Sequence, residues 1–291
     1  MNSLIYGSGF GLYGYLPAIY DFSSTIYLNE KYKTFFNSRN ELVKFESKII
    51  WYGNINKIKH KIDFLVIAKR PTDQSRIIKN LIKKKNKIKH LFLEKPISIT
   101  PKKSYELINI LNKKKINYSV GFLFKYTKWY HLIEKKISNR KENTILIKWN
   151  IPKKTKLSNL WKYNFDEGGG LIRYYGIHFI KLLSDLNFCF IKKNIIKKNC
   201  WELIILDKKN NLIKLILKYS NSSNFFYKIN KAKTNKLNNP FNNKINYKSI
   251  DPRCIFLRKY IRQNLYNDSS SNMKNFLEFW HLIEKNLSHI V

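Results

Sequence analysis

Three side chains of this sequence could act as acids or bases on one small molecule, and they are Lys95, Tyr174 and His178. Lys95 stands in Glu94-Lys95-Pro96, directly after a short apolar run. If that run is a strand of an open parallel sheet, its carboxyl end faces the ligand crevice, where a lysine can hydrogen-bond a substrate hydroxyl. The alternative is a surface lysine, because the chain contains 56 Lys+Arg residues.

Tyr174 and His178 lie four residues apart in the most distinctive segment of the chain, Gly168–His178. On an α-helix, residues at this spacing share one face, so the phenol and the imidazole can point at one substrate. Taken as an isolated pair, a core histidine beside an aromatic ring is the more common arrangement. Both interpretations stay open at this point.

Glycine is scarce, and eight of the ten glycines lie within Gly7–Gly14 and Gly168–Gly176. Glycine permits sharp turns and close approach of a ligand, so both stretches are candidate sites. The first stretch contains the sequence Gly7-Ser8-Gly9-Phe10-Gly11-Leu12. Its first two glycines are placed for a turn whose N–H groups reach a pyrophosphate. The third glycine of the usual Gly-x-Gly-x-x-Gly spacing is replaced by Leu12, which leaves a plain glycine-rich turn as the alternative.

Glu30 follows the second predicted strand, where a carboxylate can accept hydrogen bonds from ribose hydroxyls. Lys31, Lys33 and Arg39 crowd the same corner and could instead hold a 2′-phosphate. The sequence therefore leaves NAD and NADP open.

The first 120 residues alternate short strand-like runs with helical patterns, which predicts a parallel sheet wound with helices. Strands are expected at Ser3–Tyr6, Thr25–Leu28, Ile62–Ala68, Leu91–Leu93 and Tyr118–Val120. Helices are expected at Asp73–Lys84 and Lys102–Lys115, with Thr72 and Thr100 as caps.

The pattern changes after Gly121. Further strands are expected at Thr144–Trp149, Trp201–Leu206, Leu212–Tyr219 and Phe225–Ile229, helices at Leu171–Leu186, Pro252–Leu265 and Met273–Leu287, and a loop at Asn235–Lys248. We therefore expect an α/β protein with a Rossmann parallel-sheet domain at residues 1–120. The second domain, residues 121–291, is expected to be α+β with a largely antiparallel open sheet.

The formal net charge of +37 would ordinarily suggest a nucleic-acid partner. However, only eight of the 56 basic residues are arginine, and lysine is spread throughout the chain beside other residues with A+T-rich codons. Because bidentate contacts to phosphate and guanine prefer arginine, we interpret the charge as a base-composition bias. Nucleic-acid binding is the least favoured class, and no nucleic-acid partner is expected.

The three cysteines, Cys189, Cys200 and Cys254, do not form a Cys-x-x-Cys pair and are odd in number. This argues against a disulfide framework and against a zinc site. The sequence has no charged-then-apolar leader and no apolar run long enough to span a membrane. We expect a cytoplasmic protein with neither a metal nor a membrane partner.

A family resemblance rests on the order of seven motifs. They are Gly-x-Gly-Phe-Gly from Gly7, Leu16-Pro17-Ala18, Ile67-Ala68 with Pro71, Glu94-Lys95-Pro96, Gly121-Phe122, Trp161-Lys162, and the triple glycine Gly168-Gly169-Gly170 with its downstream Gly176-x-His178. This order, from residue 4 to about residue 186, resembles the glucose-fructose oxidoreductase and inositol dehydrogenase family, Gfo/Idh/MocA.

The resemblance implies NAD or NADP as cofactor and a sugar, sugar nucleotide or cyclitol as substrate. It implies that Lys95 orients the reacting hydroxyl and that His178 exchanges its proton, both over one nicotinamide ring. The family's usual aspartate is Tyr174 here, which puts catalysis in doubt, although a phenol can also act as an acid or base. The cofactor-binding residues implied are Gly7, Ser8, Gly9, Phe10, Gly11, Leu12, Glu30, Ala68, Lys69, Glu94 and Lys95. A homo-oligomer through the carboxyl-terminal sheet is also implied.

The leading hypothesis is therefore an NAD(P)-dependent oxidoreductase acting on CH–OH groups. The first alternative is a family member that binds the cofactor without catalysis. The basic pair Lys69-Arg70, where the family more often has Thr-Pro, favours a phosphorylated or nucleotide-linked substrate or reflects the lysine bias.

Overall fold

The computed structural model describes residues 1–83, 88–139, 142–153, 160–242, 249–264 and 271–289. These residues form two compact units. The first unit comprises Met1–Ser98, Glu106–Gly121 and Lys244–Ser270, and the second comprises Ile99–Tyr105, Phe122–Asn243 and Ser271–Val291. The chain therefore returns to the first unit after most of the second unit has formed.

The first unit contains a six-stranded parallel sheet with the order β3-β2-β1-β4-β5-β6. The strands are β1 (Asn2–Tyr6), β2 (Thr25–Asn29), β3 (Ile49–Tyr52), β4 (Ile62–Ile67), β5 (Ile88–Leu93) and β6 (Asn117–Val120). The strand order reverses between β1 and β4, which pair up to Tyr6 and Ile67. At such a point the carboxyl ends of the strands leave a crevice for ligands. The predicted Rossmann sheet is confirmed, and Gly7 directly follows its central strand.

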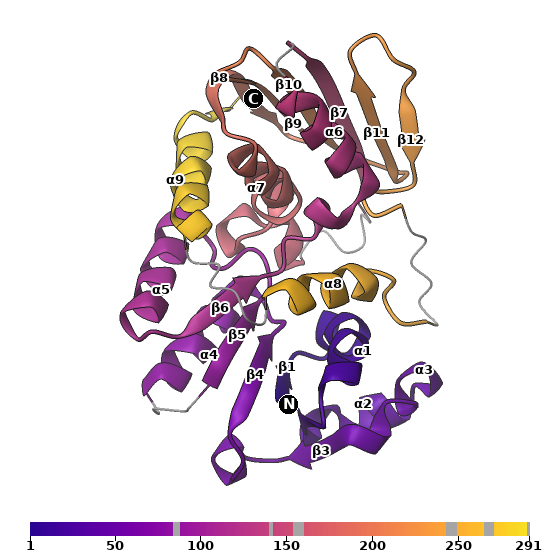
Figure 1. The fold of residues 1–291 in the computed structure, drawn as a ribbon, viewed down its shortest axis with the longest axis vertical. Helices are drawn as coiled ribbons and strands as arrows, with labels where there is room; N and C mark the ends of the chain where they lie inside the picture. The colour runs from indigo at the N-terminus through magenta and orange to yellow at the C-terminus, as the bar shows by residue number, and fades with distance from the viewer. Residues whose placement is uncertain (84–87, 140–141, 154–159, 243–248, 265–270, 290–291) are drawn as a thin grey trace. The chain divides into compact units, whose positions relative to one another are not determined.

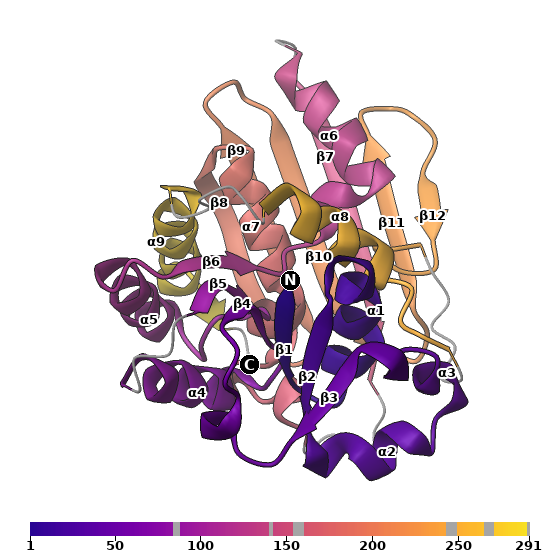
Figure 2. The same ribbon diagram turned by 60° about the horizontal axis from the view of Figure 1, so that its bottom comes forward.

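Helices accompany this sheet in Figures 1 and 2. They are η1 (Gly11–Tyr15), α1 (Leu16–Ile19), η2 (Tyr20–Phe22), η3 (Glu30–Tyr32), α2 (Lys33–Asn37), α3 (Asn40–Val43), η4 (Glu46–Lys48), η5 (Ile55–Lys57), α4 (Pro71–Lys83), α5 (Pro101–Lys113) and α8 (Cys254–Asn264). α8 packs beside α1, and its Tyr260 ring lies 5.1 Å from the Phe92 ring of β5. The Val120 N–H donates to the Tyr260 hydroxyl at 3.2 Å. A helix from far along the chain thus completes the first core.

All five predicted strands of the first unit are present, whereas β3 is an additional strand that the sequence pattern missed. Thr100 caps α5 as predicted, because its hydroxyl accepts from the Lys103 N–H at 3.2 Å. The predicted cap at Thr72 is wrong, since α4 already begins at Pro71. Proline suits the first helical position, where its missing N–H has no helical partner to lose.

The second unit contains a seven-stranded sheet with the order β12-β11-β7-β10-β9-β8-β13. The strands are β7 (Thr144–Pro152), β8 (Phe188–Lys197), β9 (Cys200–Asp207), β10 (Leu212–Ser220), β11 (Asn224–Ile229), β12 (Asn235–Leu237) and β13 (Ser288–His289). β7 pairs with β10, and β8 with β13, in parallel; the other pairs are antiparallel. The predicted, largely antiparallel sheet is confirmed.

Helices cover one face of this second sheet (Figure 1). They are η6 (Phe124–Tyr126), α6 (Lys128–Ser138), η8 (Trp161–Tyr163), η9 (Phe165–Glu167), η10 (Leu171–Gly176), α7 (Ile177–Asp185) and α9 (Ser271–Lys285). Burial alternates along the strands, as a sheet with one covered face requires. In β10, Ile213, Leu215 and Leu217 are buried, whereas Lys214 and Ile216 are only partly buried. The strand predicted at Leu212–Tyr219 is therefore present as β10, with one face covered.

Three expectations for the second unit need correction. β8 is a strand that the pattern missed, and β12 lies inside the predicted loop Asn235–Lys248. The predicted helix Leu171–Leu186 opens as a π-helix, η10, before it continues as α7. Lys84, Leu265 and residues 243–248 of the predicted segments lie outside the described residues.

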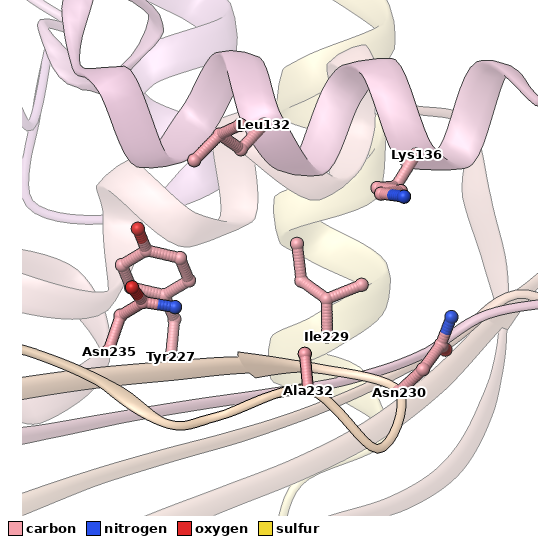
Figure 3. Close-up of a pocket in the computed structure, with 7 residues that line it drawn as sticks. All are labelled: Leu132, Lys136, Tyr227, Ile229, Asn230, Ala232 and Asn235. Atoms are coloured by element: carbon pink, nitrogen blue, oxygen red, sulfur yellow. The ribbon is translucent and has the colours of Figure 1, made fainter.

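A small cavity lies in the second unit between α6 and the β11–β12 hairpin. Figure 3 shows Leu132 and Lys136 of α6 on one side and Tyr227 and Ile229 of β11 on the other. Its volume is ≈ 260 Å³, and the predicted site residues are not part of its lining. The candidate site therefore lies elsewhere. Among the helices of the described residues, none combines the length and the apolar character needed to cross a bilayer.

Candidate functional site

The glycine-rich turn after β1 is shaped by close backbone packing. Gly7 has φ +138°, and a Cβ there would lie 2.2 Å from the carbonyl oxygen of Ala68, which directly follows β4. A Cβ at Gly11 would lie 3.2 Å from the Ile5 side chain of β1. Gly11 therefore provides the close helix–strand approach for which the third glycine of the motif usually serves. This explains how Leu12, which is fully buried, can occupy that third position.

Gly9 differs from its neighbours because a Cβ there would meet nothing within 4 Å. The helical turn starts at this point, since the N–H groups of Leu12 and Tyr13 both donate to the Gly9 carbonyl at 3.1 Å. The N–H groups that precede the first helical bonds have no intrahelical partner. The open space beside Gly9, at the start of this helical turn, fits a diphosphate bound at a helix amino terminus. The residues present therefore fit the dinucleotide that the motif predicts.

Glu94 and Lys95 follow β5 and lie in the same unit as the glycine-rich turn. The Tyr15 hydroxyl of η1 donates to Glu94 Oε1 at 2.6 Å, which links the first helical turn to this segment. Loss of hydration lowers the pKa of the Lys95 ammonium to about 8, against an attraction to Glu94 that raises it. Lys95 is therefore a group that can hold or release a proton near neutral pH.

Gln74 of α4 fixes the backbone that presents Lys95, and no motif in the sequence marks it. Its amide nitrogen donates to the carbonyls of Glu94 at 2.8 Å and Ile97 at 3.0 Å, and its carbonyl accepts from the Glu94 N–H at 3.0 Å. The Gln74 side chain is fully buried. Because these bonds go to the main chain, Gln74 sets the position of the segment that carries Lys95.

Arg253 is a second residue that sequence reasoning missed. It precedes α8, and its guanidinium carbon lies 4.3 Å from the ring centroid of Phe10, inside the glycine-rich turn. Asp251 holds it through hydrogen bonds of 2.6 Å and 2.9 Å. The Arg253 charge also lowers the pKa of Lys95. Arg253 comes from the carboxyl-terminal part of the chain. It thus contacts the glycine-rich turn through Phe10 and also influences the charge of Lys95.

The corner after β2 and β4 contains the other predicted cofactor residues. The ammonium groups of Lys31 and Lys69 lie 5.2 Å and 5.5 Å from the ring centroid of Tyr32. A Cβ at Gly53, after β3, would lie 3.0 Å from a carboxylate oxygen of Glu30. The acidic candidate Glu30 and the basic candidate Lys31 therefore follow β2 at this corner, whereas the guanidinium of Arg39 lies 5.3 Å from the ring centroid of Phe35.

The second unit contains Tyr174 and His178, the former in η10 and the latter in α7. The Tyr174 ring lies edge-on to the rings of Trp161 and Tyr175, with centroid distances of 5.2 Å and 4.8 Å. The His178 ring is 6% exposed and stacks on Phe124 at 4.5 Å. Two more rings, Phe122 at 6.1 Å and Phe241 at 6.2 Å, lie edge-on to it.

An ion pair fixes the segment that carries Tyr174. Arg173 donates to both carboxylate oxygens of Glu284 in α9, at 2.8 Å and 2.7 Å, and to the Phe165 carbonyl at 2.9 Å. The Trp280 N–H donates to the same carboxylate at 2.8 Å. Because a buried ion pair needs such additional hydrogen bonds, this cluster holds η10 in one position against α9.

The structure therefore brings the predicted residues together in two groups. The glycine-rich turn, Ala68, Lys69, Glu94 and Lys95 belong to the first unit, and Tyr174 and His178 belong to the second. Within the described ranges, no group of three or more His, Cys, Asp or Glu side chains is placed to hold a metal ion.

Comparison with protein families gives one match. Residues 1–122 match the model of the family GFO_IDH_MocA, described as an oxidoreductase family with an NAD-binding Rossmann fold. This description confirms the cofactor class, NAD or NADP, that the motifs predict. No curated protein matches the chain.

Solved structures resemble the whole chain. The WlbA (WbpB) dehydrogenase from Thermus thermophilus, in complex with NAD and UDP-GlcNAcA, has a TM-score of 0.67 and 11% identity over 100% of this chain and 96% of its own. KijD10, a 3-ketoreductase from Actinomadura kijaniata in complex with NADP and TDP-benzene, has a TM-score of 0.69 and 11% identity over 100% and 98%. A myo-inositol dehydrogenase from Corynebacterium glutamicum has a TM-score of 0.64 and 13% identity over 98% and 94%. At these identities the similarity establishes the two-domain fold.

Proposed function

We propose, on the premise that the chain belongs through residues 1–122 to the Gfo/Idh/MocA family of oxidoreductases, that it is an NAD(P)-dependent enzyme acting on CH–OH groups. Hydride would pass between the nicotinamide and a carbon of a sugar, sugar nucleotide or cyclitol. The neighbours in complex with UDP-GlcNAcA and TDP-benzene, and the myo-inositol dehydrogenase, support this range of substrates.

The observation that carries the proposal is the setting of Lys95. With a pKa of about 8, its ammonium is protonated at neutral pH and still close to the pH at which it releases the proton. Such a group can donate a hydrogen bond to the reacting hydroxyl oxygen and stabilise the developing alkoxide. The neighbouring Glu94 favours the protonated form of Lys95. The hydrogen bond that the Tyr15 hydroxyl donates to Glu94 keeps this carboxyl group in place.

The cofactor, when bound, supplies the hydride acceptor or donor. The N–H groups of Gly7–Leu12 would bind its diphosphate, and Ala68 and Lys69 would line the crevice after β4. Glu94 would accept hydrogen bonds at the nicotinamide end, next to Lys95. The open space at Gly9 supports this assignment, because a diphosphate needs that approach to the backbone.

His178 would exchange the hydroxyl proton, with Tyr174 as a further hydrogen-bond donor. Stacking on Phe124 restricts the plane of the imidazole, so its two nitrogens have fixed directions. A restricted imidazole is what proton exchange at one substrate atom requires.

The direct test replaces Lys95 by methionine. Lys95→Met should lower turnover by at least about a hundredfold, the lower range for acid–base groups, and leave the affinity for the reduced cofactor nearly unchanged. Turnover would be followed by the absorbance of reduced nicotinamide with UDP-sugars, TDP-sugars and myo-inositol. Cofactor affinity would be measured by quenching of the fluorescence of the six tryptophans. Unchanged turnover would remove Lys95 from the mechanism.

The second candidate function is cofactor binding without catalysis. It is favoured by the phenylalanine rings around His178 and by Tyr174 at the position of the family's usual aspartate. Tyr174→Asp separates the two candidates. A large gain in turnover would identify the natural chain as catalytically degenerate, whereas a loss would mean that the phenol takes part in the reaction.

We also propose a homo-oligomer through the uncovered face of the second sheet. Leu146, Ile204, Ile216 and Phe226 are partly exposed and alternate with the buried residues of their strands. Glu202 and Lys214 form an ion pair on the same face, and apolar side chains exposed around such a pair on a face without helices suit a subunit interface. Sedimentation of the wild type and of Ile216→Lys would test this, because a monomeric wild type contradicts it.

A further inference from the structure

The cavity between α6 and the β11–β12 hairpin lies apart from the candidate site and offers room for a second ligand (Figure 3). Its lining residues all belong to the second unit and include none of the residues assigned above to the cofactor or to proton transfer. Its volume of ≈ 260 Å³ exceeds the cavity of about 150 Å³ that suffices for benzene and lies below the roughly 300 Å³ at which pockets for drug-sized ligands begin. It therefore suits one ring with short substituents, and a dinucleotide is too large for it.

The middle of the cavity is apolar. In Figure 3, Leu132 points from α6 toward the sheet, and Ile229 points from β11 toward the helix. Leu132 is 47% exposed, and the ring of Tyr227 also lines the space below it. Because apolar surface gains free energy when it leaves water, the space between these side chains favours an apolar body such as a ring.

The two ends of the cavity are polar and differ in charge. Lys136, one helical turn after Leu132, lies at the end next to Asn230, whereas the Tyr227 hydroxyl and Asn235 lie at the other end (Figure 3). Within the part of the chain that the structure describes, the Lys136 ammonium forms no ion pair. Burial raises the pKa of Tyr227, so its hydroxyl stays protonated and can donate a hydrogen bond. One end therefore suits an anion, and the other suits a neutral polar group.

The wall at the charged end is held in place by hydrogen bonds. The side-chain oxygen of Asn230 accepts from the Thr144 N–H at 2.8 Å, and its side-chain nitrogen donates to the Asn143 side chain at 3.1 Å. The Ala232 N–H donates to the Ile229 carbonyl at 3.1 Å, which closes the turn after β11. Because the Asn230 amide is already hydrogen-bonded, an anion at this end would bind the lining through the neighbouring lysine of α6.

The spacing of the two ends limits the length of a ligand. Leu132 and Lys136 are separated by about 6 Å along α6, since each residue of a helix adds about 1.5 Å. Tyr227 and Ile229 are separated by about 7 Å along β11, since each residue of a strand adds about 3.3 Å. A benzene ring with one short substituent at each end spans a similar length.

From the apolar middle, the cationic end and the hydroxyl end we propose that this cavity binds a small aromatic acid with a hydroxyl group opposite its carboxylate. The carboxylate binds Lys136, the ring lies between Leu132 and Ile229, and the hydroxyl bonds Tyr227 or Asn235. One ammonium matches the single charge of a carboxylate, whereas a phosphate has more acceptor oxygens and more charge than this end can pair.

Calorimetry and saturation-transfer NMR with para-hydroxyphenylacetate test the proposal. Phenylacetate carries the same charge without the hydroxyl, and tyramine keeps the ring and the hydroxyl but replaces the carboxylate by an ammonium group. We expect para-hydroxyphenylacetate to bind most tightly. Phenylacetate should bind roughly fivefold more weakly, for one neutral hydrogen bond, and tyramine at least about tenfold more weakly, for the charged contact.

Three variants locate the site. Lys136→Gln should weaken binding of para-hydroxyphenylacetate by about tenfold, whereas Lys135→Gln removes an exposed lysine outside the lining and should leave it unchanged. Leu132→Ser removes apolar surface at a position where 47% of the residue is exposed, so the fold should persist while both acids bind about tenfold more weakly. Urea unfolding of each variant checks that the fold is intact.

Three results would overturn the proposal. Tyramine that binds as tightly as the acid would show that the charged end does not select an anion. Equal losses in Lys136→Gln and Lys135→Gln would mean general attraction to a basic protein, and no binding of the acid at millimolar concentrations would mean that the cavity is not a site for this class. The variants leave the first unit unchanged, so binding of the reduced cofactor, measured on the same samples, tests the proposed function separately.

Discussion

The two glycine-rich turns of this chain use glycine for different purposes. Each leads into a π-helical turn, η1 after Gly7–Gly9 and η10 after Gly168–Gly170. At Gly9 an added Cβ would meet nothing within 4 Å, whereas at Gly169 it would lie 2.1 Å from the Trp161 carbonyl oxygen. The first turn is closely packed at Gly7 but leaves room for a ligand at Gly9, whereas at Gly169 the second turn is filled by the protein's own backbone.

The side chains around the two turns differ in the same way. Near the first turn are the charged groups of Glu94, Lys95 and Arg253. Around the second are mainly aromatic rings, and the buried charge of Arg173 is already paired with Glu284. Scarce glycines and π-helical turns both point to functional sites. The space next to each glycine therefore distinguishes a turn that can bind a ligand from a turn that serves only close packing.

The largest effect is expected from Gly169→Ala. A methyl group at this position would overlap the backbone atoms of Trp161, Lys162 and Asn164, which lie 2.1–2.7 Å from the added Cβ. Because the neighbours are backbone and not flexible side chains, the free energy of unfolding should fall by at least about 3 kcal/mol, the upper range for overpacking. Urea unfolding followed by circular dichroism measures this.

A matched control for that variant is Gly170→Ala, whose nearest neighbours are atoms of Phe165 at 3.8 Å. Its penalty comes only from the backbone angle φ of +78°, which L-residues rarely adopt. If Gly169→Ala unfolds at the same urea concentration as the wild type, the second turn is not the packing device described above.

The parallel sheet of the first unit could be predicted because its central strands are buried on both faces. Such strands read as continuous apolar runs, and β4 (Ile62–Ile67) is an example. The edge strand β3 (Ile49–Tyr52) was missed because it lies between a short helical turn and Gly53, without the long helix that precedes β5 and β6 and makes the strand–helix alternation visible. β8 was missed because register shifts at Phe188/Phe190 and Ile191/Lys193 break the period of two.

The candidate site could be predicted only where one short segment contains the whole signal. The glycine-rich turn and Glu94-Lys95-Pro96 are such segments. Gln74 and Arg253 act through contacts with residues far along the chain, so no local pattern marks them. The packing of phenylalanine rings around His178 could not be predicted from the sequence either, because Phe241 is far from His178 along the chain.

Gly9→Ala tests whether the first turn leaves room for a ligand. The added methyl group has free space in the protein, and alanine restricts the unfolded chain more than glycine, so the free energy of unfolding should stay equal or rise by up to about 1 kcal/mol. The same methyl group would occupy the space that a diphosphate needs. The dissociation constant of the reduced cofactor should therefore rise by roughly tenfold to a hundredfold, a loss of about 1.4 to 2.7 kcal/mol.

The two glycine variants together form the decisive pair. Opposite outcomes, with Gly169→Ala unstable and Gly9→Ala stable but weakly binding, are what the structure requires. A Gly9→Ala protein that binds the cofactor with unchanged affinity would mean that the first turn is a plain glycine-rich turn.

The smallest effect is a change in pH dependence caused by Arg253. Burial lowers the pKa of Lys95 to about 8, and the Arg253 charge contributes to that lowering. If the protonated ammonium is the active form, activity should fall as the pH rises through about 8. Arg253→Met removes a positive charge that disfavours protonation, so the pKa of Lys95 rises and the alkaline limb of kcat/KM moves to higher pH.

Arg258→Met is the control for that shift, because Arg258 belongs to the same carboxyl-terminal segment but bonds the Pro17 carbonyl at 2.9 Å and Asp21 at 3.1 Å. It removes the same charge and loosens the contact between α8 and α1, yet it is not among the charges that act on Lys95. The alkaline limb should stay near pH 8 in this variant. If Arg253→Met and Arg258→Met move the limb equally, net charge and not the position of Arg253 sets the proton affinity of Lys95. A limb that neither variant moves would mean that another group titrates there, and the charged surroundings of the first glycine-rich turn would then have no part in its chemistry.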